Sequence, residues 1–168
     1  MRLRGRPDSS NRVTPSNAVR AGGFTVIEVM VTIAVIAVLS ALAIPKYRDY
    51  KENARVVQAA NDVGSIAALI QHFFIENRAY PDNLDAVNAG GQRDPWGRPY
   101  VYVAHDAKNF MKSARRDKNF KPLNSDFDLY SLGKDGVSKQ KLDAKESLDD
   151  VVRAVDGRYI GLASDFNP

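Results

Sequence analysis

The sequence predicts an α+β fold, in which a long N-terminal helix precedes a small domain of short strands. The first observation is an apolar run over residues 24–44 that contains a single charge. The second is a pattern of apolar residues at three- and four-residue spacings from Tyr47 to Phe74, which indicates an amphipathic continuation of the helix. The third is a pair of strand-like segments, 100–103 and 126–132, that lie beside turns containing Gly or Pro.

The chain begins with a basic leader over residues 1–23. It holds five arginines and one aspartate, which is the whole formal net charge of +4, so the remainder of the chain is formally neutral. The basic pI is therefore no argument for nucleic-acid binding. A secretory signal peptide places its apolar region before the cleavage site, whereas this apolar run follows Gly23. Pro7 and Pro15 oppose the amphipathic helix of a mitochondrial transit peptide.

The apolar run from Phe24 to Ile44 has the length of a membrane span. Its 21 residues would form a helix about 31 Å long, close to the ~30 Å hydrocarbon core of a bilayer. The preceding arginines favour a cytoplasmic N-terminus, which places the bulk of the chain across the membrane. Glu28 is the one charge in the run, and a carboxylate within a span costs on the order of 2.5–3.5 kcal/mol on insertion scales. We interpret Glu28 as functional; the alternative is a carboxylate at headgroup level in an ordinary anchor.

The junction Gly23-Phe24-Thr25-x-x-Glu28, with the apolar run behind it, resembles the type III signal of bacterial type IV pilins and type II secretion pseudopilins. The resemblance implies that a prepilin peptidase cleaves after Gly23 and methylates Phe24 as the mature N-terminus. It implies a role for Glu28 in assembly, through pairing with the new amine of Phe24 in the same subunit or in the next one. It also implies a pilin-like fold, with the long helix packed on a small antiparallel β-sheet domain.

Together these signals divide the chain into four parts. They are a cleaved leader (1–23), a transmembrane and filament-core helix (24–44), an amphipathic continuation (45–77) and a periplasmic globular β domain (78–168). Pro45 lies at the second boundary, where it either ends the span or loosens a continuing helix. The chain has no cysteine, so no disulfide stabilises this small domain.

The string DPWGRPY at residues 94–100 predicts a turn anchored by an aromatic side chain. It closely resembles a motif of the major pseudopilin of type II secretion, the G-type subunit. We interpret Trp96 as a core residue beneath this turn, in preference to a residue that stacks on a ligand.

Residues 126–136 resemble a second string of the G-type subunit, in which carboxylates and backbone carbonyls hold calcium. The matching carboxylates are Asp135, Asp149 and Asp150, and calcium takes six to eight oxygen ligands. The 13 residues between Asp135 and Asp149 exceed the usual spacing of the family. The resemblance therefore implies a calcium ion as the one cofactor, and the alternative is an acidic solvated loop with Asp149 and Asp150 at a helix N-terminus.

Two further segments depart from the family pattern. Residues 106–124 form a basic insert in which Phe110 and Phe120 are interleaved. Such an insert suits a nucleic-acid or partner surface, but we favour a solvated loop on the filament surface. Residues 151–168 continue beyond the part that the resemblance covers, and the sequence assigns no role to them.

No catalytic motif is found, and the two histidines, His72 and His105, have no nucleophile beside them in a recognisable motif. We therefore expect a structural protein, not an enzyme: a subunit of a type II secretion pseudopilus that polymerises in the periplasm to drive export. The alternatives are a minor type IV pilin for adhesion, motility or DNA uptake, and a single-pass anchored binding protein that does not polymerise. The expected partners are further copies of the chain, other pseudopilins, the prepilin peptidase and an assembly platform in the bacterial inner membrane, with no nucleic acid favoured.

Overall fold

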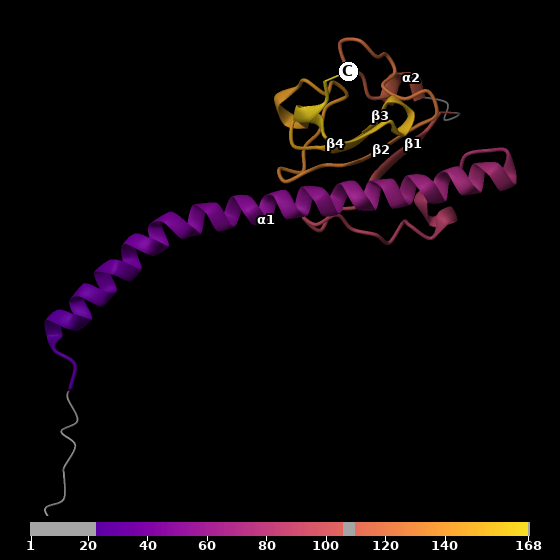
Figure 1. Ribbon diagram of the computed structural model, residues 1–168. Coiled ribbons are helices and arrows are strands. Elements are labelled where there is room, and N and C mark those ends of the chain that lie inside the picture. Colours follow the sequence, from indigo (N-terminus) through magenta and orange to yellow (C-terminus); the bar gives the residue numbers. More distant parts are fainter. Residues whose placement is uncertain (1–22, 106–109, 168) are drawn as a thin grey trace, which may run out of the picture. The chain divides into compact units, whose positions relative to one another are not determined.

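The computed structural model describes residues 23–105 and 110–167. The leader up to residue 22 and residues 106–109 of the basic insert lie outside this part of the chain. The chain divides into two compact units, residues 1–43 and 44–168. The α+β, pilin-like prediction is confirmed, because a 52-residue helix, α1 (Val26–Asn77), accompanies a four-stranded antiparallel sheet (Figure 1).

The described part of the first unit is the N-terminal portion of α1 and the three residues before it. The hydroxyl oxygen of Thr25 accepts a 3.2 Å hydrogen bond from the backbone N–H of Glu28, as the side chain of a helix N-cap does. Side chains from Gly23 to Ala43 are exposed, apart from the half-buried Ser40. Helix α1 continues past Pro45, so this proline lies inside a helix and does not end it.

The second unit contains a sheet in which neighbours in sequence are neighbours in space. Its strands are β1 (Val101–Ala104), β2 (Phe127–Ser131), β3 (Val151–Ala154) and β4 (Tyr159–Leu162), paired in that order. Val101 pairs with Tyr130, Tyr130 with Val152, and Val152 with Gly161. The sequence predicts β1 and β2 but no strands in the C-terminal segment, which supplies the other half of the sheet.

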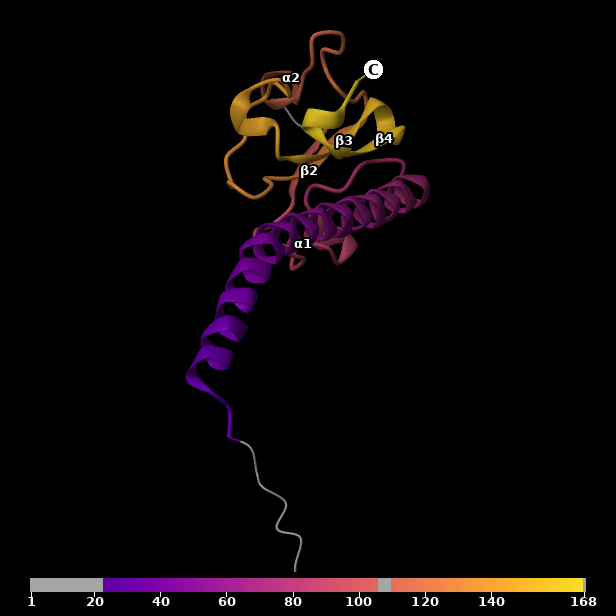
Figure 2. The same ribbon diagram turned by 60° about the vertical axis from the view of Figure 1, so that its left-hand side comes forward.

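One face of the sheet packs on the C-terminal half of α1, as both views show (Figures 1 and 2). Buried helix residues recur at spacings of three and four, which places them on one side of the helix. They are Ala59, Val63, Ile66, Ala67 and Ile70. Phe127, Leu129 and Val151 meet them from the sheet, and the other fully buried side chains of the helix-facing core come from the 78–100 segment. This segment contains a short 3₁₀ helix, Leu84–Val87, which Asn83 caps by accepting the N–H groups of Asp85 and Ala86.

The opposite face of the sheet has a smaller core of its own. It contains Leu123, Leu142, Val152, Ala154 and Ala163. Because strand side chains alternate between faces, Val151 joins the helix-facing core while Val152 joins this outer one. Leu123 belongs to the basic insert, so the insert covers the outer face together with residues that follow β2 and β4. A short helix, α2 (Phe110–Ser113), lies in the same insert.

Candidate functional site

The predicted processing and assembly residues lie at the start of the described chain. Phe24 is 81% exposed and precedes α1, and Glu28 lies in the first turn of the helix. Within residues 23–105 and 110–167, no ion pair involves Glu28. Cleavage after Gly23, methylation of Phe24 and the pairing of Glu28 stay predictions, since the leader lies outside the described residues.

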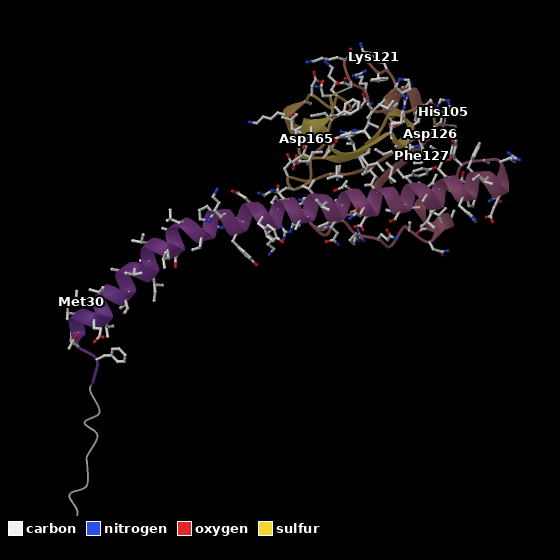
Figure 3. The ribbon with its side chains drawn as sticks, viewed as in Figure 1. Met30, His105, Lys121, Asp126, Phe127 and Asp165 are labelled. Carbon is white, nitrogen blue, oxygen red and sulfur yellow. The ribbon has the colours of Figure 1, made fainter. Side chains whose placement is uncertain are left out.

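Helix α1 presents an apolar surface that this part of the chain does not cover. It is the one helix among the described residues that is long and apolar enough to cross a membrane, with a mean hydropathy of 2.6 over its 18-residue apolar segment. None of that segment is buried, and Met30, for example, is 63% exposed (Figure 3). An apolar surface of this extent needs lipid or other protein chains against it.

The 94–100 turn is organised by a buried carboxylate. Asp94 is 4% exposed, and its Oδ1 accepts the backbone N–H groups of Trp96 at 3.1 Å and Arg98 at 2.8 Å. Its Oδ2 accepts the hydroxyl of Ser131, at the end of β2, at 2.6 Å. Gly97 has a φ of +90°, which a residue without a Cβ adopts without strain. One aspartate thus shapes the turn and connects it to the sheet.

Two aromatic side chains then connect the turn to α1. The indole Nε1 of Trp96 donates to Glu52 at 2.8 Å, and the hydroxyl of Tyr100 donates to Asp62 at 2.8 Å. Trp96 is partly buried against the helix-facing core. Its contacts therefore agree with the interpretation as a core residue beneath a turn. The motif positions the β domain on the helix, and its polar side chains bind α1 and the end of β2.

The structure brings two of the three predicted calcium ligands together. The backbone N–H of Asp135 donates to Oδ2 of Asp149 at 2.9 Å, and Oδ1 of Asp135 accepts the N–H of Val137 at 2.7 Å. Asp135 is exposed and Asp149 is half-buried. The bond from the Asp135 N–H to the Asp149 carboxylate closes the β2–β3 loop, which we define as residues 132–150, while the Asp135 carboxylate makes a local bond within the loop.

The third predicted ligand, Asp150, has a different partner. Its Oδ2 accepts the guanidinium Nη2 of Arg115 at 2.7 Å and the hydroxyl of Ser138 at 2.5 Å, and both side chains of the ion pair are at least 98% buried. Burial raises the pKa of Asp150 to about 6, while Arg115 and Ser138 act in the opposite direction. In the described ranges, no three His, Cys, Asp or Glu residues are grouped to hold a metal ion. One oxygen of the Asp150 carboxylate is therefore paired with a cation of the protein itself, Arg115.

Arg115, in the basic insert, is a buried site residue that the sequence does not predict. Besides its bond to Asp150, its Nη1 donates to Ser138 at 2.6 Å, and its guanidinium lies 4.2 Å from the ring centroid of Tyr130. Its backbone N–H donates to Asp128 at 2.6 Å. Other buried residues of the insert are Phe110, Ala114, Leu123 and Asn124. The expectation of a solvated loop is thus wrong for these buried residues at the two ends of the insert, and the interleaved Phe110 was the signal in the sequence that indicated burial.

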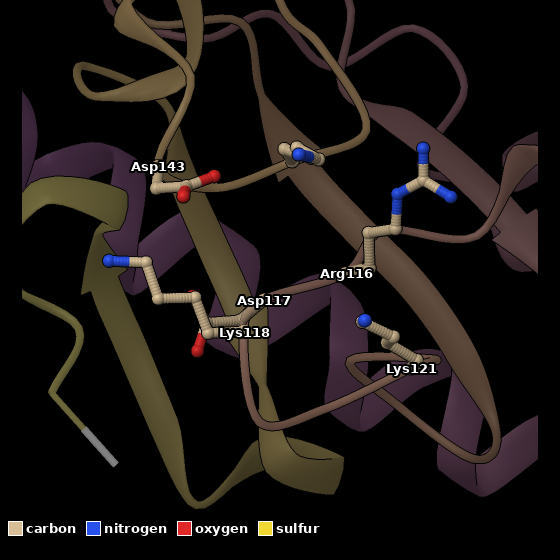
Figure 4. A pocket seen from close by; sticks show the side chains of 6 residues that line it. Arg116, Asp117, Lys118, Lys121 and Asp143 are labelled. Atoms are coloured by element: carbon tan, nitrogen blue, oxygen red, sulfur yellow. The ribbon is translucent and has the colours of Figure 1, made fainter.

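The middle of the insert, residues 116–121, is mostly exposed and basic. A cavity of about 360 Å³ is lined there by four cationic and two acidic side chains (Figure 4). They are Arg116, Lys118, Lys121, Lys141, Asp117 and Asp143. Backbone hydrogen bonds between Arg116 and residues 140 and 142 hold its two walls together. Two acids among four cations leave a modest positive excess, which is a weaker signal than a nucleic-acid groove requires.

A second, largely buried ion pair connects the C-terminal segment to the residue that precedes β2. Arg153 donates to both carboxylate oxygens of Asp126, at 2.7 and 2.6 Å, and its guanidinium lies 4.1 Å from the ring centroid of Phe127. Figure 3 shows Asp126 and Phe127 on the part of the sheet near α1. Gln71 of α1 also donates to Asp126, at 3.1 Å. The segment to which the sequence assigned no role is therefore part of the folded core.

Comparison of the sequence with known proteins identifies a family model and several relatives. The family model described as "Prokaryotic N-terminal methylation motif" matches residues 19–44. The chain is 30% identical to "Type II secretion system core protein G" of Pseudomonas aeruginosa over 135 residues, which cover 68% of this chain and 84% of that protein.

Other relatives agree to different extents. "Type II secretion system core protein G" of Klebsiella pneumoniae is 26% identical over 74% of this chain and 92% of that protein. A "Fimbrial protein" of Pseudomonas aeruginosa is 36% identical over 33% of this chain and 36% of that protein. No solved structure was found to match the chain. The extent and identity of the first match show that the chain is a type IV pilin-like protein and belongs to the type II secretion system core protein G family.

Proposed function

We propose that this protein is a structural subunit of a type II secretion pseudopilus, which polymerises in the periplasm and thereby drives protein export. The observation that carries the proposal is the uncovered apolar part of α1, with Glu28 in its first turn. The relatives named core protein G in Pseudomonas and Klebsiella align with 68% and 74% of the chain, against 33% and 55% for fimbrial relatives of Pseudomonas and Neisseria. This difference favours secretion over piliation.

The apolar surface of α1 must be buried against different partners before and after the subunit assembles. Large side chains such as Ile27 and Leu42 are 69% and 68% exposed. Burying one such side chain fully is worth about 1.5–3 kcal/mol. Lipid covers them while the subunit waits in the bacterial inner membrane as a single-pass protein with its C-terminal domain in the periplasm. Neighbouring copies must cover them after extraction, so a subunit that leaves the membrane enters a bundle of like helices.

Glu28 sets the axial offset between neighbouring helices of this bundle. Its carboxylate has no ionic partner among the described residues, and an uncompensated charge in apolar surroundings is unfavourable. Cleavage after Gly23 would create a positive amine on Phe24, four residues away along the chain. Pairing between Glu28 of one copy and the amine of the next would fix their axial offset. Processing would then precede assembly, since the amine exists only after the cut.

The proposed partners follow from this sequence of events. The prepilin peptidase acts on Gly23 and Phe24, an inner-membrane assembly platform adds the subunit, and other copies and other pseudopilins surround it in the filament. The role is structural, and the chemistry is performed on the chain by its peptidase. Its formally neutral mature part removes the electrostatic repulsion that a strongly charged subunit would meet on stacking.

The decisive experiment compares Glu28→Ala with Glu76→Ala in the native host. Glu76 is a carboxylate of the same helix that lies outside the apolar run and is 61% exposed. We expect Glu28→Ala to lose the cross-linked ladder of multimers and at least 90% of export, while Glu76→Ala retains both. Intact mass of the purified wild type should show an N-methylated chain that starts at Phe24. A Glu28→Ala protein that is cleaved, stable, polymeric and export-competent would contradict the proposal.

The same strains separate the other two candidate functions. A minor type IV pilin would leave export intact on deletion and would impair adhesion, motility or DNA uptake. A non-polymerising anchored protein would be indifferent to Glu28→Ala and would give no ladder of multimers. Loss of export together with loss of the ladder is expected only for a pseudopilus subunit.

A further inference from the structure

Two guanidinium groups from different parts of the chain bind the oxygens of the β2–β3 loop. Arg98, from the 94–100 turn, donates to the backbone carbonyls of Gly133 at 2.7 Å and Lys134 at 3.2 Å. Arg115, from the basic insert, donates to the carboxylate of Asp150 at 2.7 Å and to the hydroxyl of Ser138 at 2.6 Å. Arginine side chains of the protein itself thus bind the loop near its start and at its end.

The loop backbone is shaped to accept Arg98. Gly136 has a φ of +75°, and a Cβ built on it would collide with the guanidinium of Arg98. Gly133 has a φ of +62°, and a Cβ there would collide with the backbone carbonyl of Asp149. A side chain at Gly133 would meet the backbone at the far end of the loop, whereas one at Gly136 would displace the guanidinium of Arg98.

Asp150 requires a positive partner because it is fully buried. A buried carboxylate without a counter-charge destabilises the folded state, and it is tolerated when it is paired and hydrogen-bonded. A divalent cation or a guanidinium can meet this need, but the two differ in what they demand. Calcium needs six to eight oxygens converging at 2.3–2.6 Å, whereas a guanidinium brings planar N–H donors to separate acceptors. The oxygens of this loop are spread over separate acceptors, which suits guanidinium groups.

We propose that Arg98 and Arg115 take the place of a divalent cation in the β2–β3 loop, so that the folding of this domain is independent of calcium. This inference is separate from the proposed function, since it concerns how the domain is stabilised and not what it assembles into. The proposal also assigns a role to the basic insert, which positions Arg115 against the outer face of the sheet. Without Asp150, the carboxylates of Asp135 and Asp149 supply at most four oxygens, fewer than the six to eight that calcium takes, and Arg98 already binds the carbonyls of Gly133 and Lys134.

The test uses the full chain purified in mild detergent, with thermal unfolding followed by circular dichroism. The wild type should have the same melting temperature, within about 1 °C, in millimolar calcium and in excess EGTA, and should bind no calcium in a direct titration at millimolar concentration. Arg115→Ala should melt roughly 10 °C lower, because it leaves Asp150 buried without its charge partner. Arg116→Ala, which removes the adjacent exposed arginine, should melt within about 1 °C of the wild type.

Each outcome decides for or against the proposal. A wild type that melts several degrees higher in calcium than in EGTA would overturn it, as would an Arg115→Ala variant that melts like the wild type. If Arg115→Ala does not fold at all, Arg98→Ala offers a milder change, because it frees backbone carbonyls near the loop surface and no buried carboxylate. Arg98→Ala should melt a few degrees below the wild type in both solutions, and an unchanged melting temperature would contradict the role of Arg98.

Discussion

The hydroxyl of Tyr100 donates a 2.8 Å hydrogen bond to a carboxylate oxygen of Asp62, which lies 38 residues earlier on α1. Burial raises the pKa of Tyr100 well above its usual value, and the hydrogen bond to Asp62 and the nearby negative charges raise it further. The folded state therefore stabilises the neutral phenol. Since Trp96 is the one tryptophan of the chain and lies in the same turn, its fluorescence reports on this region.

This relationship predicts a loss of stability at alkaline pH. A tyrosine whose pKa is raised by folding contributes stability that is complete below the unfolded-state pKa of about 10 and is lost as pH rises toward the folded-state pKa. We expect the free energy of unfolding to fall above pH 10 by up to about 1.4 kcal/mol per pH unit from this group. The measurement is urea unfolding between pH 8 and about 11, followed by Trp96 fluorescence.

The matched variants isolate Tyr100 from the other tyrosines. Tyr100→Phe should be less stable than the wild type at pH 8 and should show a shallower decline above pH 10. Tyr47→Phe, which alters a tyrosine that is 67% exposed, should follow the wild-type curve. Parallel curves for Tyr100→Phe and the wild type would show that the Tyr100–Asp62 bond does not couple folding to pH.

Local signals in the sequence predicted the helix and the turn well. Two features determine the backbone within a few residues of their own position: the periodic apolar residues of α1, and the Pro, Gly and Trp of the 94–100 turn. The local structure can therefore be inferred from their spacing alone. The Arg115–Asp150 pair joins residues 35 apart, and no spacing rule connects an arginine of a basic insert to one of two adjacent aspartates. Strands β3 and β4 were missed for a related reason. Each has four residues, and pairing across the sheet determines their conformation more than their own sequence does.

Asp94 should be among the most sensitive polar residues of the domain. Asp94→Ala removes the acceptor of three hydrogen bonds and leaves donors of Trp96, Arg98 and Ser131 without their partner. We expect a loss of about 3 kcal/mol in the free energy of unfolding, because unsatisfied buried donors are costly. The exposed Asp82 gives a matched control, and Asp82→Ala should change stability by about 0.5 kcal/mol or less. Equal stabilities of the two variants in urea unfolding would contradict the role assigned to Asp94.

The Arg153–Asp126 pair predicts that the C-terminal segment is required for folding. Arg153→Ala breaks a bidentate pair whose arginine is 3% exposed and removes its contact with the Phe127 ring. We expect a loss of about 3–5 kcal/mol, as is found on removing one partner of a buried ion pair. Arg158→Ala, which alters an exposed arginine of the same segment, should leave urea unfolding nearly unchanged. If Arg153→Ala unfolds at the wild-type midpoint, the segment is an appendage and not part of the core.

Gly133 and Gly97 provide a test of how closely the β2–β3 loop is packed. Both have positive φ, +62° at Gly133 and +90° at Gly97, so an alanine at either position meets a conformational penalty of roughly 1–2 kcal/mol. A Cβ at Gly97 would have no atom within 4 Å, whereas one at Gly133 would collide with the backbone carbonyl of Asp149. Gly133→Ala should therefore be the more destabilised of the two by at least about 2 kcal/mol in urea unfolding, since backbone cannot move aside as a flexible side chain can. Equal losses of stability would mean that the backbone at Asp149 moves aside at no cost in free energy. The β2–β3 loop would then be held less tightly than its contacts with Arg98 and Arg115 require.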